Sequence, residues 1–365
     1  MSCRTAVWLT HRNPYGRETG GAERAVRETC WGMVRGGWKV VVFTCGSQGE
    51  GGPIERSGLD LVTCSSWSGL HLSLPMFLRE HADASIIIED LAHVVPFGAE
   101  KFTKLPGVVA FRHLHRRTLP GQVSLPPRLL LSGLERAYPM IYKNWPIVAP
   151  SSSALSDLVT LGFPRERIHI IEYGVDTDLF NPGRLTPKPS LVHFAGLRPY
   201  KRPEHALVVL RILTALGQDV DLYLVGVGPS AASLARAAQK FGIADRVHFT
   251  GRLSDEQLAR LVGSAWVHLQ PAIAEGWGLT VDEAAAAGVP TVAYDVPGLR
   301  DAVIPGVTGQ LVPDNRPDAM AEAVRRILAD RSVWTDRCRR AVYTHSWKSV
   351  SAHWAEYLAS LLDNK

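Results

Sequence analysis

The chain alternates short apolar runs with segments of helical periodicity along its whole length. Most of the apolar runs are nearly continuous, which is typical of strands that are covered on both faces of a parallel sheet. The runs are Ala6–Thr10, Val40–Thr44, Ser85–Ile88, Val108–Phe111, Ile147–Ala149, His169–Ile171, Leu191–Ala195, Leu222–Val225, Val247–Phe249, Val267–Leu269, Thr291–Ala293 and Gln310–Val312. Helical patterns between them include Glu23–Arg35, Pro203–Leu216, Ser230–Phe241 and Asp255–Val262. This repeated alternation predicts an α/β protein with two doubly wound, Rossmann-like domains.

A proline-rich segment separates the two halves. Residues Asn181–Pro189 contain three prolines and a glycine between periodic stretches, which is typical of a linker. We therefore expect an N-terminal domain over residues 1–184 and a C-terminal domain over residues 185–345, a division that suits a chain of 365 residues. The end of the chain, within residues 346–365, has apolar residues at helical spacing and predicts an amphipathic helix. Residues 46–58 are glycine-rich and predict a mobile loop.

Composition places the chain among ordinary globular proteins. It is 46% hydrophobic and 21% charged, with a net charge of +5 and a pI near 9.0. That charge suits anionic ligands or an anionic membrane surface, but no basic block interleaved with aromatic residues indicates nucleic-acid binding. The N-terminus lacks the long apolar run of a secretion signal, and no apolar stretch reaches the roughly 18 residues that a membrane span needs. With five scattered cysteines and no C-x-x-C pair, we expect a cytoplasmic protein with at most peripheral membrane contact.

Residues 275–288, EGWGLTVDEAAAAG, bring an acid, a glycine-rich turn and a helix start together. The two glycines of the turn let the backbone approach a ligand closely. The amides and macrodipole of a helix that begins near Thr280 favour a phosphate or diphosphate, and Glu275 and Glu283 can accept hydrogen bonds from sugar hydroxyls on either side. The alternative is a capping box, in which Thr280 and Glu283 only satisfy the helix start. The acid before the glycine turn favours a nucleotide-sugar site.

The sequence from Glu275 to Val303 resembles the signature of the retaining glycosyltransferases of family 4, which have the GT-B fold. That family carries two glutamates eight positions apart, E-x7-E, which Glu275 and Glu283 match. Further segments that resemble the family, in the right order, are Thr19–Arg24, Gly174–Asp176, Tyr200–Arg202 and Val225–Pro229. The resemblance covers nearly the whole chain. It implies two Rossmann-like domains that face each other across a cleft, with the C-terminal helix crossing back to the first domain.

Gly20 and Gly21 follow the first strand and open a helix that contains Glu23. Glycines at this point let the loop pass close to a diphosphate or a sugar in the cleft that the resemblance implies. A simple turn between strand and helix is the alternative. The motifs of the second half favour the site.

Arg198, Lys201 and Arg202 form a basic cluster just after a predicted strand. Cations at the carboxyl end of such a strand can neutralise a departing nucleoside diphosphate, although a solvated surface cluster would have the same sequence. The family places an arginine directly after the loop glycine, in the pattern G-R-L-x-x-x-K. Counted back from Lys201, Gly196 stands in the place of that arginine, so Arg198 would act from a shifted position.

A histidine pair follows the strand that ends at Phe111, where the family often carries a histidine close to the transferred sugar. We assign that contact to His113 first and to His115 second, with an ordinary surface histidine as the alternative for either. Two histidines at this spacing also fit half of a metal site, but no third ligand with suitable spacing accompanies them. Glu89 and Asp90 end the preceding strand and can either contact the acceptor or cap a helix.

Asp176 and Asp178 spell D-x-D, which is the metal–diphosphate motif of the other glycosyltransferase fold. The resemblance instead places these residues in a G-V-D turn that binds no metal. We therefore expect no metal site there.

The glycines of Val225–Pro229 look like a dinucleotide fingerprint. The next strand, however, ends in Thr250-Gly251 rather than in the acid that would bind a ribose. An oxidoreductase is therefore the weaker interpretation. Gly226, with Arg252 and Leu253 after that strand, instead suits the wall of a pocket for a nucleotide base.

We predict a retaining enzyme that moves a hexose-type sugar from a nucleoside-diphosphate sugar to an acceptor hydroxyl. The resemblance implies same-face attack, in which the departing diphosphate helps to deprotonate the acceptor, without a cofactor or a metal. Glu275 would contact the sugar, Glu283 the ribose, and Lys201 the diphosphate. The expected catalytic residues are Glu275, His113, Lys201 and Arg198. The expected donor-binding residues are Gly20, Gly21, Arg198, Lys201, Gly226, Arg252, Leu253, Gly276, Trp277, Gly278, Leu279, Thr280 and Glu283.

The resemblance leaves the acceptor open among a sugar, a lipid and a small metabolite, and it does not specify the base of the donor. Two other functions fit the same fold. One is a nucleotide-sugar epimerase or hydrolase, and the other is a relative that binds the donor without transferring its sugar.

Overall fold

The computed structural model describes residues 4–16, 20–46 and 58–363 of the chain. Contacts group the chain into two compact units: Met1–Arg116, Ser124–Gly174 and Trp347–Lys365 form the first, and Arg117–Val123 and Val175–Ser346 the second. The sequence placed residues 175–184 in the first domain, but the Val175 N–H donates to the His345 carbonyl at 2.8 Å and so joins the second unit. Thr19 and residues 47–57 of the glycine-rich segment lie outside the described residues.

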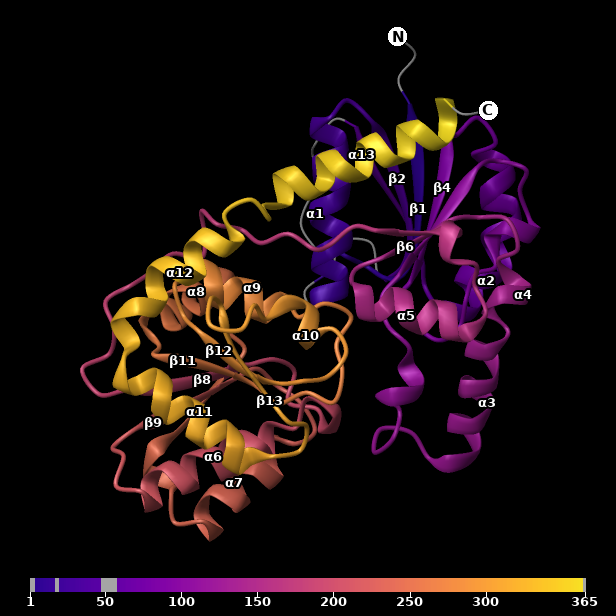
Figure 1. The fold of residues 1–365 in the computed structure, drawn as a ribbon. Coiled ribbons are helices and arrows are strands. Elements are labelled where there is room, and N and C mark those ends of the chain that lie inside the picture. The colour runs from indigo at the N-terminus through magenta and orange to yellow at the C-terminus, as the bar shows by residue number, and fades with distance from the viewer. Residues whose placement is uncertain (1–3, 17–19, 47–57, 364–365) are drawn as a thin grey trace. The chain divides into compact units, whose positions relative to one another are not determined.

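In the described part of the first unit, seven parallel strands form one sheet in the order β3-β2-β1-β4-β5-β6-β7. Figure 1 shows its neighbouring strands β2, β1 and β4. The strands are β1 Thr5–Arg12, β2 Lys39–Cys45, β3 Leu59–Cys64, β4 Ile86–Leu91, β5 Gly107–Phe111, β6 Ile147–Ala149 and β7 Ile168–Ile170. The chain order reverses between β1 and β4. In open α/β sheets, ligands bind outside the carboxyl ends of the strands at such a reversal.

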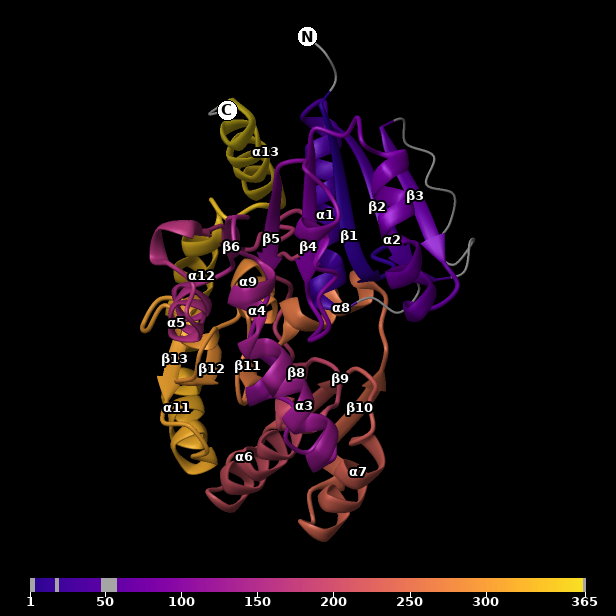
Figure 2. The ribbon, with the colours of Figure 1, turned by 90° about the vertical axis from the view of Figure 1, so that its right-hand side faces the viewer.

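The strand β3 is missing from the sequence-based prediction. It pairs with β2 in register from Val40 and Leu59 to Cys45 and Cys64. Figure 2 shows it at the outer edge of the sheet, where only its first residue is fully buried. An edge strand that is covered incompletely needs no continuous apolar run, so its sequence lacks the signal that identified the other strands.

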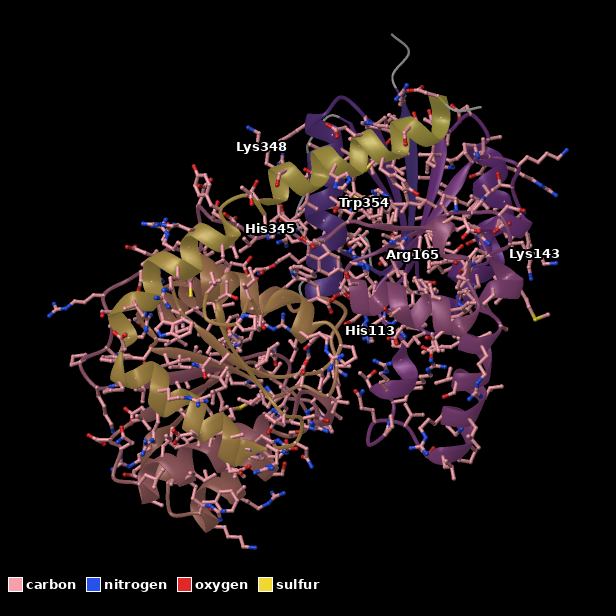
Figure 3. The ribbon with its side chains drawn as sticks, viewed as in Figure 1. His113, Lys143, Arg165, His345, Lys348 and Trp354 are labelled. Atoms are coloured by element: carbon pink, nitrogen blue, oxygen red, sulfur yellow. The ribbon has the colours of Figure 1, made fainter. Side chains whose placement is uncertain are left out.

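Helices connect these strands. The α-helices of the first unit are α1 Gly21–Arg35, α2 Trp67–Glu80, α3 Leu125–Arg136, α4 Tyr138–Ile141, α5 Ser152–Leu161 and α13 Trp347–Asp363. Its 3-10 helices are η1 Ala99–Lys101, η2 His115–Arg117 and η3 Arg165–Arg167. The predicted amphipathic helix at the end of the chain is thus confirmed as α13. It packs against α1, and the ring of its Trp354 lies 5.6 Å from that of Trp8 in β1 (Figure 3).

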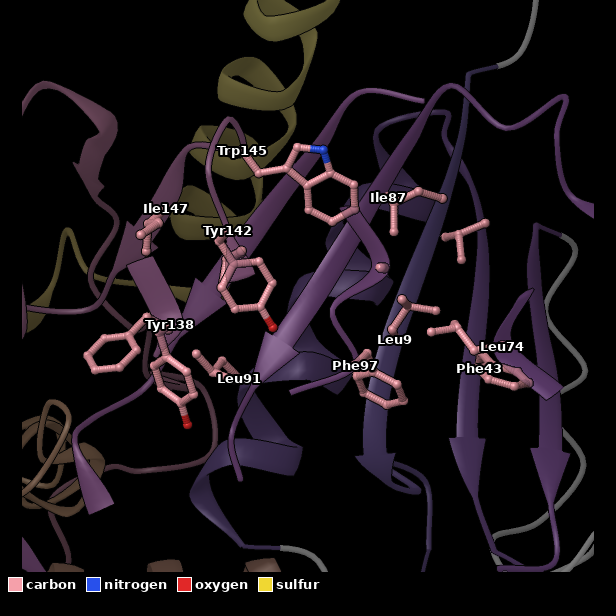
Figure 4. Packing of buried hydrophobic residues seen from close by; sticks show 14 of the residues in the cluster. Leu9, Phe43, Leu74, Ile87, Leu91, Phe97, Tyr138, Tyr142, Trp145 and Ile147 are labelled. Atoms are coloured by element: carbon pink, nitrogen blue, oxygen red, sulfur yellow. The ribbon is translucent and has the colours of Figure 1, made fainter. Parts of the chain in front are cut away.

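The hydrophobic core of the first unit gathers side chains from the sheet and from the helices that cover it (Figure 4). Phe43 of β2 stacks on Phe77 of α2 with ring centroids 4.0 Å apart. Trp145 packs against Gly107 of β5 so closely that a Cβ at this glycine would collide with the indole ring. These contacts pack β2 against α2 and β5 against the segment that leads into β6.

The described part of the second unit holds a parallel sheet of six strands in the order β10-β9-β8-β11-β12-β13. The strands are β8 Ser190–Phe194, β9 Asp221–Val225, β10 Val247–Gly251, β11 Val267–Gln270, β12 Thr291–Tyr294 and β13 Gly309–Val312. The six apolar runs predicted for this half are therefore confirmed as strands. The chain order reverses between β8 and β11, so the loops after these two strands flank the expected ligand position.

The helices of the second unit fall between these strands and after them. The α-helices are α6 Pro203–Ala215, α7 Ala231–Lys240, α8 Asp255–Ser264, α9 Leu279–Ala286, α10 Leu299–Ala302, α11 Pro317–Ala329 and α12 Trp334–Val342. The 3-10 helices are η4 Pro199–Lys201, η5 Ala244–Arg246 and η6 Arg331–Val333. None of the helices in the described part of the chain combines the length and the apolar character that crossing a bilayer requires.

Candidate functional site

Lys201 and Glu275 meet where the strand order of the second unit reverses. Lys201 ends the loop after β8, Glu275 lies in the loop after β11, and the Lys201 ammonium donates to the Glu275 carboxylate. Each side chain is 15% exposed. Burial lowers the pKa of Lys201, but Glu275 and Tyr200 raise it by more, so the ammonium remains charged. The two loops therefore place a cation and an acid together at the position where this type of sheet binds ligands.

Backbone contacts hold the Glu275 loop in place. The Ile273 N–H donates to the Tyr200 carbonyl at 2.9 Å, and the Glu275 N–H donates to the Pro297 carbonyl at 3.0 Å. Gly298 has a left-handed backbone with φ 82°, and a Cβ there would collide with the carbonyl oxygen of Glu275. The position of Glu275 thus depends on the loops after β8 and β12 as well as on its own.

The helix after this loop begins earlier than the sequence suggested. Gly278, with φ 119°, is the N-cap of α9, and the helix starts at Leu279. Thr280 is therefore the second helical residue, and the proposed capping box between Thr280 and Glu283 is wrong because neither residue occupies the position that a capping box requires. The left-handed backbone at Gly278 costs a glycine little. The first amides of the helix that follows have no partner within the helix itself.

Gln270 is a site residue that the sequence analysis missed. It is the last residue of β11, is fully buried, and donates from Nε2 to the Thr280 hydroxyl at 2.8 Å. A hydroxyl that accepts this bond keeps its own proton for a ligand. The sequence feature that could have identified Gln270 is a single amide side chain at the end of an otherwise apolar strand.

Trp277 and Glu283 are both buried. The Trp277 indole N–H donates to the Asp282 carboxylate at 2.5 Å, which fixes the turn to the first turn of α9. Glu283 lies one residue further along the same helix. The structure thus places Trp277 against the protein interior, and the assignment of both residues to the donor stays a prediction.

The basic cluster after β8 divides into residues with different surroundings. Arg198 is exposed, as is Gly196, which stands where the family has its arginine. Arg202 adopts a left-handed backbone with φ 47°, caps α6, and pairs with Asp314 at 2.5 Å. Of these three cations, Lys201 pairs with Glu275, and the assignment of Arg198 to a diphosphate stays a prediction.

Gly226, Arg252 and Leu253 follow the neighbouring strands β9 and β10. Gly226 has φ 124°, and its N–H donates to the Gly251 carbonyl at 2.8 Å. A Cβ at Gly226 would collide with the carbonyl oxygen of Ala195, so close packing of two loops already explains this glycine. Arg252 is exposed and Leu253 is half-buried at the same edge of the sheet. Their contact with a nucleotide base stays a prediction.

In the first unit, Gly20 and Gly21 stand at the start of α1. The Gly20 N–H donates to Glu23 Oε2 at 2.8 Å, and Gly21 is the first helical residue. The buried Glu23 carboxylate therefore caps the helix, as the simpler interpretation of this motif requires. The turn lies after β1, beside the reversal of strand order in this unit.

The two histidines after β5, His113 and His115, have different surroundings. The His115 ring bonds to the Ala92 carbonyl at 3.0 Å, and its backbone N–H donates to the buried Glu135 at 2.5 Å. These bonds hold the turn, so the structure makes His115 a residue of the scaffold. His113, whose ring lies 4.5 Å from that of His115, is half-buried on the preceding loop (Figure 3).

Glu89 and Asp90 are fully buried at the end of β4 and do not face an acceptor. Glu89 accepts hydrogen bonds from the amides of Phe97, Gly98 and Ala99 at 2.7 to 3.0 Å and from the Tyr142 hydroxyl. Burial raises its pKa, and these donors oppose that rise.

Asp90 pairs with the buried Arg112 at 2.6 Å, and Arg112 in turn donates to the Tyr173 hydroxyl at 2.7 Å. Of the two alternatives left open for Glu89 and Asp90, the acceptor contact is therefore wrong. Their carboxylates instead stabilise the loops at the carboxyl ends of the strands.

A cluster of imidazole and aromatic rings lies at the same end of the sheet, and the sequence analysis did not predict it. His11 Nε2 lies 3.1 Å from His71 Nε2, and the His11 ring stacks on Phe97 with centroids 4.2 Å apart. His93 and Trp67 are also in contact, at 5.0 Å. Burial and the neighbouring imidazoles lower the pKa of His11 to about 3, and burial with Arg12 and His115 nearby lowers the pKa of His93 to about 4.

Asp176 and Asp178, the D-x-D motif, form a turn. Asp176 Oδ1 accepts hydrogen bonds from the backbone N–H groups of Asp178 at 3.1 Å and Leu179 at 2.9 Å. Across the described residues, no three His, Cys, Asp or Glu side chains gather in a way that could hold a metal ion. The carboxylate of Asp176 thus serves the backbone of its own turn.

Two family models match successive parts of the chain. Residues 19–179 match the family described as Glycosyltransferase Family 4, and residues 175–344 match the family described as Glycosyl transferases group 1. Together the matched ranges include Glu275, Glu283, Lys201 and His113.

Curated relatives and solved structures agree with these matches. Over 214 residues the chain is 34% identical to the MMP alpha-(1->4)-mannosyltransferase of Mycolicibacterium hassiacum, covering 56% of this chain and 52% of the relative. Over 240 residues it is 31% identical to the D-inositol 3-phosphate glycosyltransferase of Nocardia farcinica, covering 60% and 51%. The chain thus spans about half the length of the curated relatives it matches. The sucrose-phosphate synthase of Thermosynechococcus elongatus shares the fold, with a TM-score of 0.83, 22% identity, and 99% and 100% coverage.

Proposed function

Because the chain belongs to the family 4 glycosyltransferases with the GT-B fold, we propose that it transfers a hexose-type sugar from a nucleoside-diphosphate sugar to an acceptor hydroxyl. The observation that supports this most strongly is the pairing of Lys201 with Glu275 beside the start of α9. A cation, an acid and free helix amides within one loop system suit a sugar that is joined to a diphosphate. We further propose that the transfer retains the anomeric configuration.

The second unit would hold the donor. The first amides of α9, at Leu279 and Thr280, would bind the diphosphate together with Lys201 and Arg198. An ammonium carries three protons, so Lys201 can hold Glu275 and a diphosphate oxygen at the same time. Glu275 would then orient the sugar hydroxyls, and Glu283 would accept hydrogen bonds from the ribose.

In the proposed reaction, the acceptor oxygen attacks the anomeric carbon from the face that the diphosphate leaves. The bond from that carbon to the diphosphate oxygen breaks as the new glycosidic bond forms, and the acceptor proton passes to the departing diphosphate. The main task of the protein would be to stabilise the negative charge that gathers on the diphosphate. Lys201, Arg198 and the α9 amides supply that stabilisation, and for this reason we propose a reaction that requires no metal. The first unit would present the acceptor, with His113 as a contact to the transferred sugar.

The proposal is tested by a thermal-shift screen against UDP-, GDP-, ADP- and TDP-sugars, with mannose as the first hexose because one relative carries that specificity in its name. A true donor at a hundred times its Kd should stabilise the native state by about 2.7 kcal/mol through mass action. The matching donor is then incubated with sugar, lipid and polyol acceptors in the presence of EDTA, and the anomeric configuration of the product is read by NMR.

The results separate the possible functions. Stabilisation by one donor with transfer in EDTA supports the proposal. Hydrolysis or epimerisation of that donor without an acceptor would identify a different enzyme, and stabilisation without any turnover would identify a protein that only binds the donor. A screen in which no nucleotide sugar raises the melting temperature would contradict the proposed site itself.

A further inference from the structure

Helix α3, Leu125–Arg136, turns its leucines outward. Leu125 is 55% exposed, Leu129 63% and Leu130 74%. With Gly133 and Arg136, which are also exposed, they recur at positions i, i+4, i+5, i+8 and i+11, which is one side of an α-helix. A helix that covers a soluble core normally buries its apolar side. We refer to Leu125, Leu129, Leu130 and Arg136 as the α3 face.

The opposite side of α3 explains why the helix holds this orientation. Glu135 is fully buried there and accepts hydrogen bonds from the backbone N–H groups of His115 at 2.5 Å and Arg116 at 3.1 Å. A buried carboxylate that loses such donors is strongly destabilising, so rotating α3 to bury its leucines would cost more than it gains. The outward orientation is therefore built into the fold of the first unit.

The exposed charges of the segment that contains the α3 face all have the same sign. Between Ser124 and Lys143 the chain carries Arg128, Arg136 and Lys143, and its single carboxylate is the buried Glu135. Within the described residues, none of these three cations forms an ion pair, and Lys143 is exposed (Figure 3). The following helix α4 adds Met140, which is 71% exposed. An exposed apolar patch thus coincides with unpaired positive charge.

We propose that the α3 face docks the first unit on an anionic lipid surface. Exposed leucines can enter the boundary between headgroups and acyl chains, while arginine and lysine beside them are attracted to anionic headgroups. The absence of any exposed carboxylate in Ser124–Lys143 leaves only positive charge beside the exposed leucines, which is complementary to an anionic lipid surface. This docking requires neither donor nor acceptor, so it is independent of the proposed transfer reaction.

The test is co-sedimentation of the full chain with vesicles of phosphatidylcholine alone and of phosphatidylcholine mixed with phosphatidylglycerol. We expect binding to the mixed vesicles only, weakened as salt screens the basic residues. The double substitution Leu129→Glu and Leu130→Glu should lower the partition coefficient at least about tenfold. The substitution Arg136→Gln should lower binding more weakly and reduce its dependence on salt.

The matched control is the double substitution Leu72→Glu and Met76→Glu in α2. Leu72 is 83% exposed and Met76 62%, and both lie in the same unit, so the change in charge is the same while the α3 face is untouched. This variant should bind vesicles as the unchanged protein does, and circular dichroism should give all variants the same melting temperature.

Three results would overturn the docking surface. The unchanged protein could remain in the supernatant with the mixed vesicles. The α2 double variant could lose binding as strongly as the α3 double variant, which would assign the effect to overall charge. Light scattering could instead show a dimer that the α3 double variant splits, in which case a second copy of the chain covers the α3 face. None of these results depends on whether the protein transfers a sugar.

Discussion

At the scale of single residues, Lys201 and Glu275 connect the two loops that form the candidate site. The sequence places each residue in its own motif. They can form an ion pair only because β8 and β11 are neighbours in the sheet, which brings the loops after these strands together. Gln270 adds a second such link, from the end of β11 to the Thr280 hydroxyl. The Lys201–Glu275 pair alone joins residues that are 74 positions apart in the chain.

Replacing Glu275 with alanine should lower kcat by roughly 10²- to 10³-fold, because the variant loses the group that orients the reacting sugar beside the diphosphate. Steady-state transfer assays measure this, with circular dichroism to show that the fold remains. The matched control is Glu204→Ala, which removes an exposed acid from α6 of the same unit. Transfer by Glu275→Ala at the rate of the unchanged protein would remove Glu275 from the site.

The ring cluster around His11 predicts acid sensitivity of the first unit. The pKa values of about 3 for His11 and about 4 for His93 lie below the value of about 6.5 in an unfolded chain. As the pH falls below about 6.5, the unfolded chain takes up protons first, so stability should be complete above that pH and decrease toward about pH 4. For His11 alone the loss by about pH 4 is on the order of 3 kcal/mol.

Urea unfolding at several pH values checks this prediction, with tryptophan fluorescence as the signal. The substitution His11→Gln removes one of the titrating rings and should flatten the dependence on pH. His248→Gln, which removes a half-buried imidazole from the second unit, is the control and should leave the dependence unchanged. An identical pH profile for His11→Gln would show that another group causes the loss of stability.

At the scale of elements, the loop after β12 supports the loop that carries Glu275. Gly298 begins α10 with a left-handed backbone, and its Cα lies so close to Glu275 that no side chain fits. The start of α9 is held in the same region, since Gly278 faces Leu299 and Ala302 of α10. Three short elements thus determine where the acid and the first helix amides point.

The substitution Gly298→Ala should therefore destabilise the second unit by about 2–4 kcal/mol and also lower transfer, because the new methyl group displaces the Glu275 backbone. Gly306→Ala is the matched control. Gly306 also has a left-handed backbone, with φ 76°, but no atom lies within 4 Å of its Cβ position. It should cost only about 1–2 kcal/mol and leave kcat unchanged. Urea unfolding and transfer assays on both variants measure the difference, and equal effects on kcat would contradict the role of Gly298.

At the scale of the whole molecule, the two ends of the described chain belong to the same compact unit. Helix α13 packs against α1, and Arg4 pairs with Asp363 at 2.8 Å. Gly32 of α1 lies against the side chain of Ser351 of α13, which a Cβ at this glycine would overlap. The first unit is therefore completed only after the residues of the second unit have been synthesised.

Gly32→Ala should destabilise the first unit by about 1–3 kcal/mol, because a Cβ at this position would overlap Ser351. Gly133→Ala provides the contrast, since no atom lies within 4 Å of its Cβ position in α3. It should stabilise the unit by up to about 1 kcal/mol through helix propensity. Differential scanning calorimetry on both variants tests the pair, and a Gly32→Ala protein as stable as the unchanged one would rule out this close helix contact.

Much of the fold could be predicted because its signals are local. A buried parallel strand needs a continuous apolar run, and twelve of the runs coincide with strands. The edge strand β3 was not predicted because a partly exposed strand does not need a continuous apolar run. The sequence placed the N-cap of α9 at Thr280, two residues after its position at Gly278. The N-cap is set by the backbone conformation and not by the threonine that resembled a cap.

The sequence by itself determined the strand–helix alternation, the family, and the glutamates and basic residues from which the site is proposed. The alternation follows from periodicity, whereas the family and the site residues follow from the resemblance of short motifs to those of a known family. Both kinds of signal depend only on residues that are close in the chain. Only the tertiary structure decided that Glu89 and Asp90 serve the scaffold, that Lys201 pairs with Glu275, and that the leucines of α3 face outward. The physical reason is that a side chain's partner is set by which strands become neighbours and which faces are buried, and both depend on contacts between residues that lie far apart in the chain.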